Sequence, residues 1–124
     1  MKQRWVDGNS FSLLENGEAF FPRVFEAIAA AQKDILLETF ILFDDKVGRA
    51  LQKALVEAAQ RGVEVDMTID GWGSPDLSEE FISTLTNAGV RVHVFDPAPG
   101  MFRRVHLFRR LHRKLIVIDG TTGF

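Results

Sequence analysis

The sequence has 124 residues, of which 46% are hydrophobic, with no cysteine and a formal net charge of −2. This length and apolar content are typical of one globular domain, and the lack of cysteine excludes disulfides and thiolate metal sites. The longest apolar stretch, residues 35–43, is interrupted by Glu38 and Thr39. It is far shorter than the roughly 20 residues of a membrane-spanning helix, so we expect any membrane contact to be peripheral.

The first predicted elements are a short strand and a helix near the N-terminus. Residues 11–15, FSLLE, have the apolar character of a strand and precede an Asn16-Gly17 turn signal. Pro22 suits the first turn of a helix, and the apolar residues around it recur at helical spacing. These residues are Phe21, Phe25, Ile28 and Ala29. We therefore predict a strand at 11–15 and a helix that Pro22 opens.

A strand, a helix and a second strand are predicted next. Residues 34–43, DILLETFILF, are nearly continuously apolar, which is typical of a strand covered on both faces of a parallel sheet. From Val47 to Gln60 the apolar positions follow the helical period, and Gly62 is placed to end that helix. Residues 63–70, VEVDMTID, alternate between apolar and polar as a strand does.

A third helix and another strand follow the loop GWGSPD. Asp76 and Glu79 resemble a capping box and predict a helix that runs to about Ala88. VRVHVF at 90–95 alternates like a strand. Strands and helices that alternate at this spacing form βαβ units, so the predicted fold class is α/β, with a parallel or mixed sheet flanked by helices. No linker or repeat interrupts the pattern, which favours one domain, or one piece of a domain, over residues 1–124.

Positive charge is concentrated at the C-terminal end. Residues 1–102 contain 9 basic and 16 acidic side chains, whereas residues 103–124 contain 6 basic and 1 acidic. A phosphate-bearing partner, either a lipid head group or a nucleic acid, would be attracted to such a segment. A solvated basic loop would have the same composition.

Within this basic end, LHRKLIVID at residues 111–119 predicts a buried strand entered from a basic loop. Because side chains alternate along a strand, His112 and Lys114 are expected on one face, about 7 Å apart, with Arg113 on the other. An imidazole can attack phosphorus, and a neighbouring ammonium can stabilise charge on the phosphate oxygens. This pair therefore indicates phosphoryl chemistry.

Asp119 lies seven residues beyond His112. An extended strand would separate the two by about 23 Å, which is too far for a hydrogen bond. We therefore expect Asp119 to end the strand and brace the adjoining turn rather than orient His112.

The order H-x-K-x4-D formed by His112, Lys114 and Asp119 resembles the HKD signature of the phospholipase D superfamily. HRKLIVIDG is similar to the version in bacterial cardiolipin synthases, above all those of the B type. The likeness extends upstream through three segments in the same order: LLENGEAFFPRVFEAIAAAQKDILLETFILFDD, GVEVDMTIDGWGSPDLSEEF and AGVRVHVFDP. It covers almost the whole chain.

This resemblance implies a phospholipase D-like fold and a candidate catalytic set of His112, Lys114 and Asp119. It further implies that His112 attacks the phosphodiester of phosphatidylglycerol to form a phosphohistidine, while Lys114 binds the phosphate. A second phosphatidylglycerol then takes the phosphatidyl group, giving cardiolipin and glycerol without a metal or other cofactor. The implied location is peripheral, on the cytoplasmic side of the bacterial inner membrane.

The chain departs from its family by ending at Phe124, before a glycine-rich segment and a second HKD motif. The resemblance therefore implies an N-terminal portion that is inactive alone and needs the missing C-terminal half or a second chain. An alternative is a phosphodiesterase or nuclease that works as a homodimer of single-motif chains.

Further candidates lie outside the motif. Glu38 interrupts an apolar strand, where a carboxylate needs a partner, and could support the site or meet a loop arginine. Asp70 ends a strand where α/β sheets present ligands, although turn stabilisation explains it as well. His93 and His106 are expected to be ordinary surface or core residues.

Residues 101–114, MFRRVHLFRRLHRK, alternate apolar residues with pairs of arginines. Apolar side chains beside arginines suit a peripheral membrane segment that meets lipid phosphates, and they could also hold a nucleic-acid backbone. We prefer lipid because of the family resemblance. The predicted substrate- or membrane-binding residues are Arg103, Arg104, Arg109 and Arg110.

Overall fold

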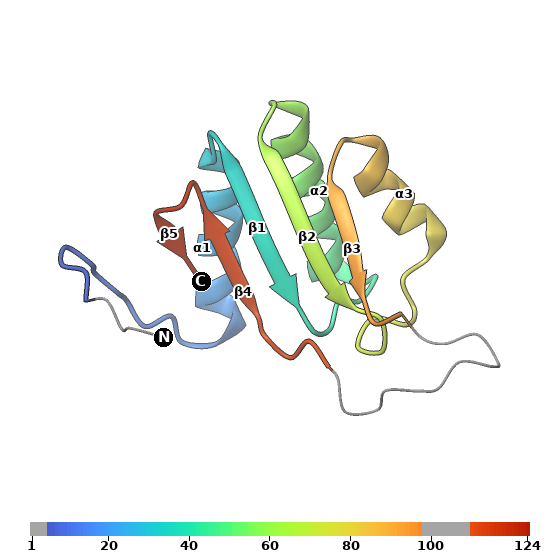
Figure 1. The fold of residues 1–124 in the computed structure, drawn as a ribbon, viewed down its shortest axis with the longest axis horizontal. Helices are drawn as coiled ribbons and strands as arrows, with labels where there is room; N and C mark the ends of the chain where they lie inside the picture. The colour runs from blue at the N-terminus through green and yellow to red at the C-terminus, as the bar shows by residue number, and fades with distance from the viewer. Residues whose placement is uncertain (1–4, 98–109) are drawn as a thin grey trace.

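The computed structural model describes residues 5–97 and 110–124 as an α/β fold, which confirms the predicted class (Figure 1). The helices are α1 (Asn16–Ala30), α2 (Lys46–Gln60) and α3 (Glu79–Asn87). The strands are β1 (Asp34–Thr39), β2 (Glu64–Asp70), β3 (Arg91–Phe95), β4 (Leu115–Ile118) and β5 (Thr122–Gly123). In the part of the chain that the structure describes, no helix is both long enough and apolar enough to cross a bilayer.

The strands form one mixed sheet in the order β3-β2-β1-β4-β5. Strands β1, β2 and β3 are parallel, whereas β4 runs antiparallel to β1 and β5 antiparallel to β4. The carboxyl ends of the parallel strands and the amino end of β4 therefore lie at the same end of the sheet. This arrangement brings the segment that precedes β4 beside the loops that follow β1 and β2.

The core lies between one face of the sheet and the three helices, which Figure 1 shows on the same side. Alternate strand residues such as Ile35, Leu37 and Met67 point into it and are almost fully buried. Ile28, Leu55 and Phe81 meet them from α1, α2 and α3. Burying these apolar side chains is the main stabilising contribution to such a layer.

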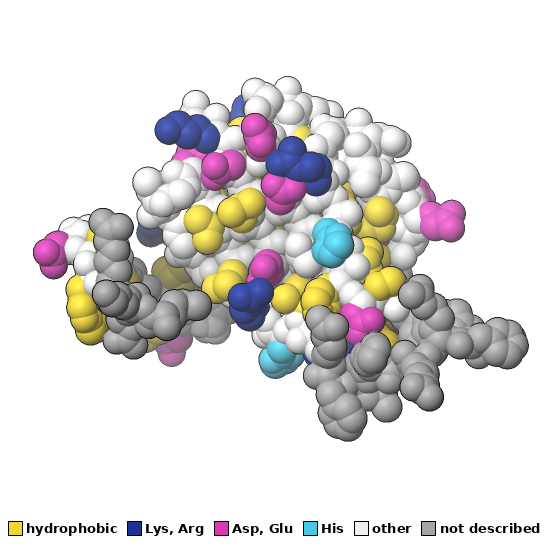
Figure 2. All heavy atoms as spheres, viewed as in Figure 1, with side chains coloured by type: hydrophobic (Ala, Val, Ile, Leu, Met, Phe, Trp, Pro, Cys, Tyr) yellow, Lys and Arg dark blue, Asp and Glu magenta, His cyan; other side chains and the backbone are white. Residues whose placement is uncertain are grey.

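The opposite face of the sheet is open in the described part of the chain (Figure 2). We predicted that β1 is covered on both faces. Leu36 on β1 is 49% exposed, so among the described residues only one face is covered and the prediction is wrong. The same face carries Arg91, which pairs with Asp66 through Nε to Oδ1 at 2.6 Å. Strand β1 also stops at Thr39 instead of residue 43, because the Thr39 hydroxyl donates to the carbonyl of Ile41 and the chain turns.

The N-terminal prediction is corrected in two places. Residues 11–15 do not form a strand, and Phe11 and Leu13 are almost fully exposed. Helix α1 begins at Asn16 instead of Pro22, which lies inside it. Asn16 adopts a positive φ of 58°, and its side-chain oxygen accepts a hydrogen bond from the amide of Glu18 at 2.9 Å. This local bond starts the helix six residues before the proline.

Helix boundaries elsewhere follow from side-chain caps. Asp45 accepts a hydrogen bond from the amide of Gly48 at 2.8 Å and caps α2, which ends before Gly62 at a positive φ of 91°. Helix α3 is capped by Ser78, whose hydroxyl accepts from the amide of Phe81 at 3.1 Å. The capping box predicted to start at Asp76 is therefore wrong, although the helix itself is present.

Replacing Ser78 and Asp76 in turn tests which of them caps α3. We expect Ser78→Ala to lower the free energy of unfolding by about 1 kcal/mol, because it removes an N-cap acceptor. The exposed Asp76→Ala change should stay within about 0.5 kcal/mol of the parent. Urea unfolding followed by circular dichroism measures both, and a larger loss for Asp76→Ala would contradict the assignment.

Candidate functional site

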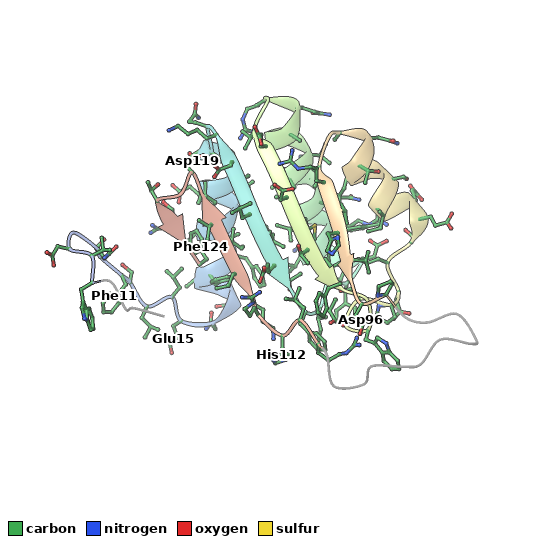
Figure 3. The ribbon with its side chains drawn as sticks, viewed as in Figure 1. Phe11, Glu15, Asp96, His112, Asp119 and Phe124 are labelled. Carbon is green, nitrogen blue, oxygen red and sulfur yellow. The ribbon has the colours of Figure 1, made fainter. Side chains whose placement is uncertain are left out.

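His112 and Lys114 lie in the extended segment just before β4. Both are exposed. Figure 3 shows His112 at the lower end of the sheet. The predicted strand across residues 111–119 is therefore too long, since β4 includes only Leu115–Ile118. The shorter strand leaves both side chains on a segment that reaches solvent.

The ring of Phe40 brings these two side chains together. The imidazole of His112 approaches it edge-on, with ring centroids 4.8 Å apart, and Lys114 Nζ lies 5.5 Å from the Phe40 centroid. Lys114 Nζ also donates to the backbone carbonyl of His112 at 3.1 Å. Between them, Arg113 turns toward β1, where its Nε lies 2.9 Å from Glu38 Oε2. His112 and Lys114 thus share one aromatic neighbour while Arg113 pairs elsewhere.

Phe40 is held by the loop that follows β2. The Ser74 hydroxyl donates to the carbonyl of Phe40 at 3.2 Å and accepts from the amide of Leu42 at 2.9 Å. A Cβ at Gly73 would lie 2.0 Å from the same Phe40 carbonyl oxygen, so only glycine allows the two loops to approach this closely. The GWGS sequence therefore positions the ring that His112 and Lys114 contact.

Asp70, at the end of β2, connects this loop to the segment that carries His112. Its Oδ1 accepts from the amides of Trp72 and Gly73 at 2.9 and 3.0 Å, and its Oδ2 accepts from the amide of Leu111 at 2.9 Å. The side chain is fully buried. Burial alone would raise its pKa, but these hydrogen bonds, together with the charge of Arg110, outweigh it and hold the pKa of Asp70 below its ordinary value. Asp70 therefore fixes the backbone one residue before His112.

Arg110 completes this buried cluster. Its Nη1 lies 3.1 Å from Asp70 Oδ1, its Nη2 lies 2.7 Å from Asp96 Oδ2, and its guanidinium sits over the ring of Trp72. Only 20% of its side chain is exposed. Arg110 therefore has internal acidic partners, and its predicted role in binding lipid stays a prediction. The other predicted lipid-binding residues, Arg103, Arg104 and Arg109, lie outside the described residues, as does His106.

Asp119 lies at the opposite end of β4 from His112 (Figure 3). Its carboxylate accepts from the amides of Gln32, Lys33 and Asp34 at 3.0, 2.8 and 3.2 Å. These bonds, that from Lys33 above all, lower the pKa of Asp119. Asp119 follows the last residue of β4 and makes no hydrogen bond to His112 among the described residues, as predicted, but its carboxylate braces the turn between α1 and β1 rather than the adjoining turn.

Two other polar candidates have plain structural contacts. Glu38 pairs with Arg113 through its buried Oε2, and its Oε1 accepts from Arg113 Nη2 at 3.4 Å. His93 is exposed on the open face of the sheet, where its Cα pairs in register with Thr68 of β2. Neither side chain is in contact with His112 in the hydrogen bonds and ion pairs of the described residues.

An apolar groove lies beside Lys114 and has a volume of about 460 Å³. It is formed by α1, the loop between β1 and α2, the first turns of α2, and β4. Sequence reasoning missed it, because Phe21 was assigned to the core stripe of its helix and residues 40–43 to a strand. In the sequence, Phe21 and residues 40–43 can be recognised only as mostly apolar, and apolar character alone does not predict a groove.

Comparison with known proteins places these features in a family. The family described as cardiolipin synthase, phospholipase D (PLD)-like domain matches residues 24–124, which includes β1 to β5 and the His112 segment. The chain belongs to this family. The matched residues contain the H-x-K-x4-D motif and the GWGS loop.

Curated relatives include cardiolipin synthase B of Escherichia coli (strain K12), which is 54% identical over 125 residues. That match covers 100% of this chain and 30% of the relative. Cardiolipin synthase A of Pseudomonas fluorescens is 41% identical over 116 residues, which are 94% of this chain and 24% of that protein. The chain thus spans less than a third of the length of these relatives.

Solved structures share the fold. The phospholipase D family member Nuc from Salmonella typhimurium matches with a TM-score of 0.52 and 26% identity, over 79% of this chain and 56% of that one. NucT from Helicobacter pylori matches with a TM-score of 0.53 and 14% identity, over 79% of this chain and 58% of that one. At that identity the second likeness concerns the fold alone.

The role of Asp119 predicts a pH-dependent effect on stability. Because its pKa is lower in the folded chain, its ionised form stabilises the fold above its unfolded pKa of about 3.9, and this contribution is lost as pH falls through the folded pKa. We expect Asp119→Asn to lower the urea midpoint at pH 7 and the difference from the parent to shrink toward pH 3. Asparagine tolerates the positive φ of 53° at this position, so backbone strain is not introduced.

The matched control is Asp76→Asn, which removes an exposed carboxylate without these amide contacts. It should leave the urea midpoint unchanged across the same pH range. A difference between Asp119→Asn and the parent that stayed constant down to pH 3 would show that the charge of Asp119 is not what braces the turn.

Proposed function

We propose that this chain is the N-terminal part of a cardiolipin synthase, which transfers a phosphatidyl group between two phosphatidylglycerol molecules to give cardiolipin and glycerol. The observation that carries the proposal is the pairing of His112 and Lys114 around Phe40, both open to solvent, in a member of the cardiolipin synthase PLD-like family. The names of the relatives support the substrate class.

In the first step the neutral imidazole of His112 attacks the phosphorus of one phosphatidylglycerol. A bond from nitrogen to phosphorus forms, the bond to the glycerol oxygen breaks, and glycerol leaves after taking a proton from a second acid. In the second step a hydroxyl of another phosphatidylglycerol attacks the phosphohistidine, loses its proton to that same group, and releases His112. Lys114 stabilises negative charge on the non-bridging oxygens in both steps.

The acid comes from outside these 124 residues in this scheme. The sequence contains H-x-K-x4-D once, and the family resemblance supplies the second histidine from a later motif. We therefore propose that residues 1–124 alone are inactive and that the complete site needs a C-terminal half. Phosphatidylglycerol places the enzyme at the membrane surface, and we propose a peripheral position on the cytoplasmic side of the bacterial inner membrane.

A second candidate is a phosphodiesterase or nuclease formed by two copies of a single-motif chain. It is favoured by the likeness to Nuc, a phospholipase D family member of which this chain covers more than half. In this scheme His112 of one copy attacks phosphorus and His112 of the other protonates the leaving oxygen. A monomeric gene product that does not cleave DNA would remove this candidate.

The assignment of His112 is tested in the complete gene product with phosphatidylglycerol vesicles. We expect His112→Ala to reduce cardiolipin formation by about a thousand-fold or more, because it removes the nucleophile. His93→Ala is the matched control, since His93 is also exposed but lies on β3, and it should retain parental activity. Mass spectrometry of the extracted lipids measures both, and full activity in His112→Ala would overturn the role of that residue.

A further inference from the structure

The groove beside Lys114 has an apolar rim that is open to solvent. Four of its lining apolar residues come from α1, the loop after β1, and α2, and each is 37–50% exposed. These residues are Phe21, Ile41, Phe43 and Val47. Large apolar side chains gathered at one concave surface indicate that something apolar covers them. The volume of about 460 Å³ lies within the roughly 300–1,000 Å³ of small-molecule sites.

The acidic residues at this groove have partners, whereas its lysine has no acidic partner among the described residues. Two acidic residues are among its lining residues, but the carboxylate of Glu38 pairs with Arg113 and that of Asp45 accepts a hydrogen bond from the amide of Gly48. Lys114 also lines it, and among the described residues no carboxylate lies within ion-pair distance of its ammonium. The groove therefore combines an apolar interior with a positive charge that is not neutralised by a neighbouring acid.

This combination is complementary to an anionic amphiphile. An apolar chain in the groove would cover Phe21, Ile41 and Val47, and an anionic group joined to it would lie at Lys114. His112 would then be close to the same anionic group, because it shares the Phe40 ring with Lys114. A peptide segment would also cover apolar residues, but it would not by its nature bring a negative charge to Lys114.

We infer that this groove binds one acyl chain of a phospholipid and so places its phosphate beside Lys114 and His112. The inference rests on the proposed function, because that function supplies the phospholipid. It adds a site for the apolar part of the substrate, which the H-x-K-x4-D motif does not contain. The acyl chain then contributes to positioning phosphorus for attack, since a lipid fixed at two points loses most of its freedom to rotate.

The test measures binding of two soluble lipids, dihexanoyl and dioctanoyl phosphatidylglycerol, to the complete gene product by calorimetry. The longer lipid adds two methylenes per chain, and burying them in the groove should tighten binding by about ten-fold. Val47→Gln places a polar group on the rim and should reduce this ratio to below about three-fold. Ile41→Gln, in the loop rather than in α2, should have the same effect and excludes a defect particular to the helix.

Val94→Gln is the matched control. Val94 is 38% exposed, against 37% for Val47, but it lies on β3 and does not line the groove. The same substitution there should leave the ten-fold ratio unchanged. If Val47→Gln and Ile41→Gln also left the ratio unchanged, the groove would not hold the acyl chain, and another part of the polypeptide or a second copy would cover it.

Cardiolipin formation measured on the same samples separates this inference from the proposed reaction. A chain-length effect that depends on Val47, without any cardiolipin formed, would support the acyl site and overturn the proposed transfer. The opposite result would be cardiolipin formation together with an affinity ratio that neither Val47→Gln nor Ile41→Gln changes. It would support the transfer and overturn the acyl site.

Discussion

The buried carboxylate of Asp70 is the interaction on which the candidate site depends. Moving an unpaired charge into a protein interior is costly, and here three backbone amides and the guanidinium of Arg110 offset that cost. Its two oxygens serve different segments: one binds the loop after β2, and the other binds the amide of Leu111. One side chain therefore fixes both the loop that supports Phe40 and the segment that carries His112.

The direction of β4 explains why these parts meet. Because β4 runs antiparallel to β1, residues that precede β4 reach the edge where β1 and β2 end. Loops beyond the carboxyl ends of parallel strands are where α/β folds place ligands. His112, Lys114 and the apolar groove share this edge, whereas Asp119 lies at the other edge and braces a turn. Of the three motif residues, His112 and Lys114 thus form the pair that we propose to be chemical, whereas Asp119 has structural contacts.

The sequence allowed much of the fold to be predicted, and the errors have local causes. Helix α2 and strands β2 and β3 appear near their predicted positions, because their periodicity is regular. The start of α1 was missed because a proline signal was preferred to the side-chain bond of Asn16. The spacing of His112 and Lys114 predicted a common side, which their shared contact with Phe40 fits. The link from Asp70 to Leu111 joins residues 41 apart, and no local pattern contains it.

The role of Asp70 is tested most directly by measuring the unfolding free energy and the backbone amide resonances of the Asp70→Asn variant. The amide retains one oxygen, so either the loop after β2 or the amide of Leu111 faces an NH₂ group, and the pair with Arg110 loses its charge. If Asp70 holds the two segments together, Asp70→Asn loses about 2–5 kcal/mol of unfolding free energy at pH 7 and shifts the amide resonances of Leu111 and His112. Unchanged stability together with unchanged resonances at those residues would contradict it.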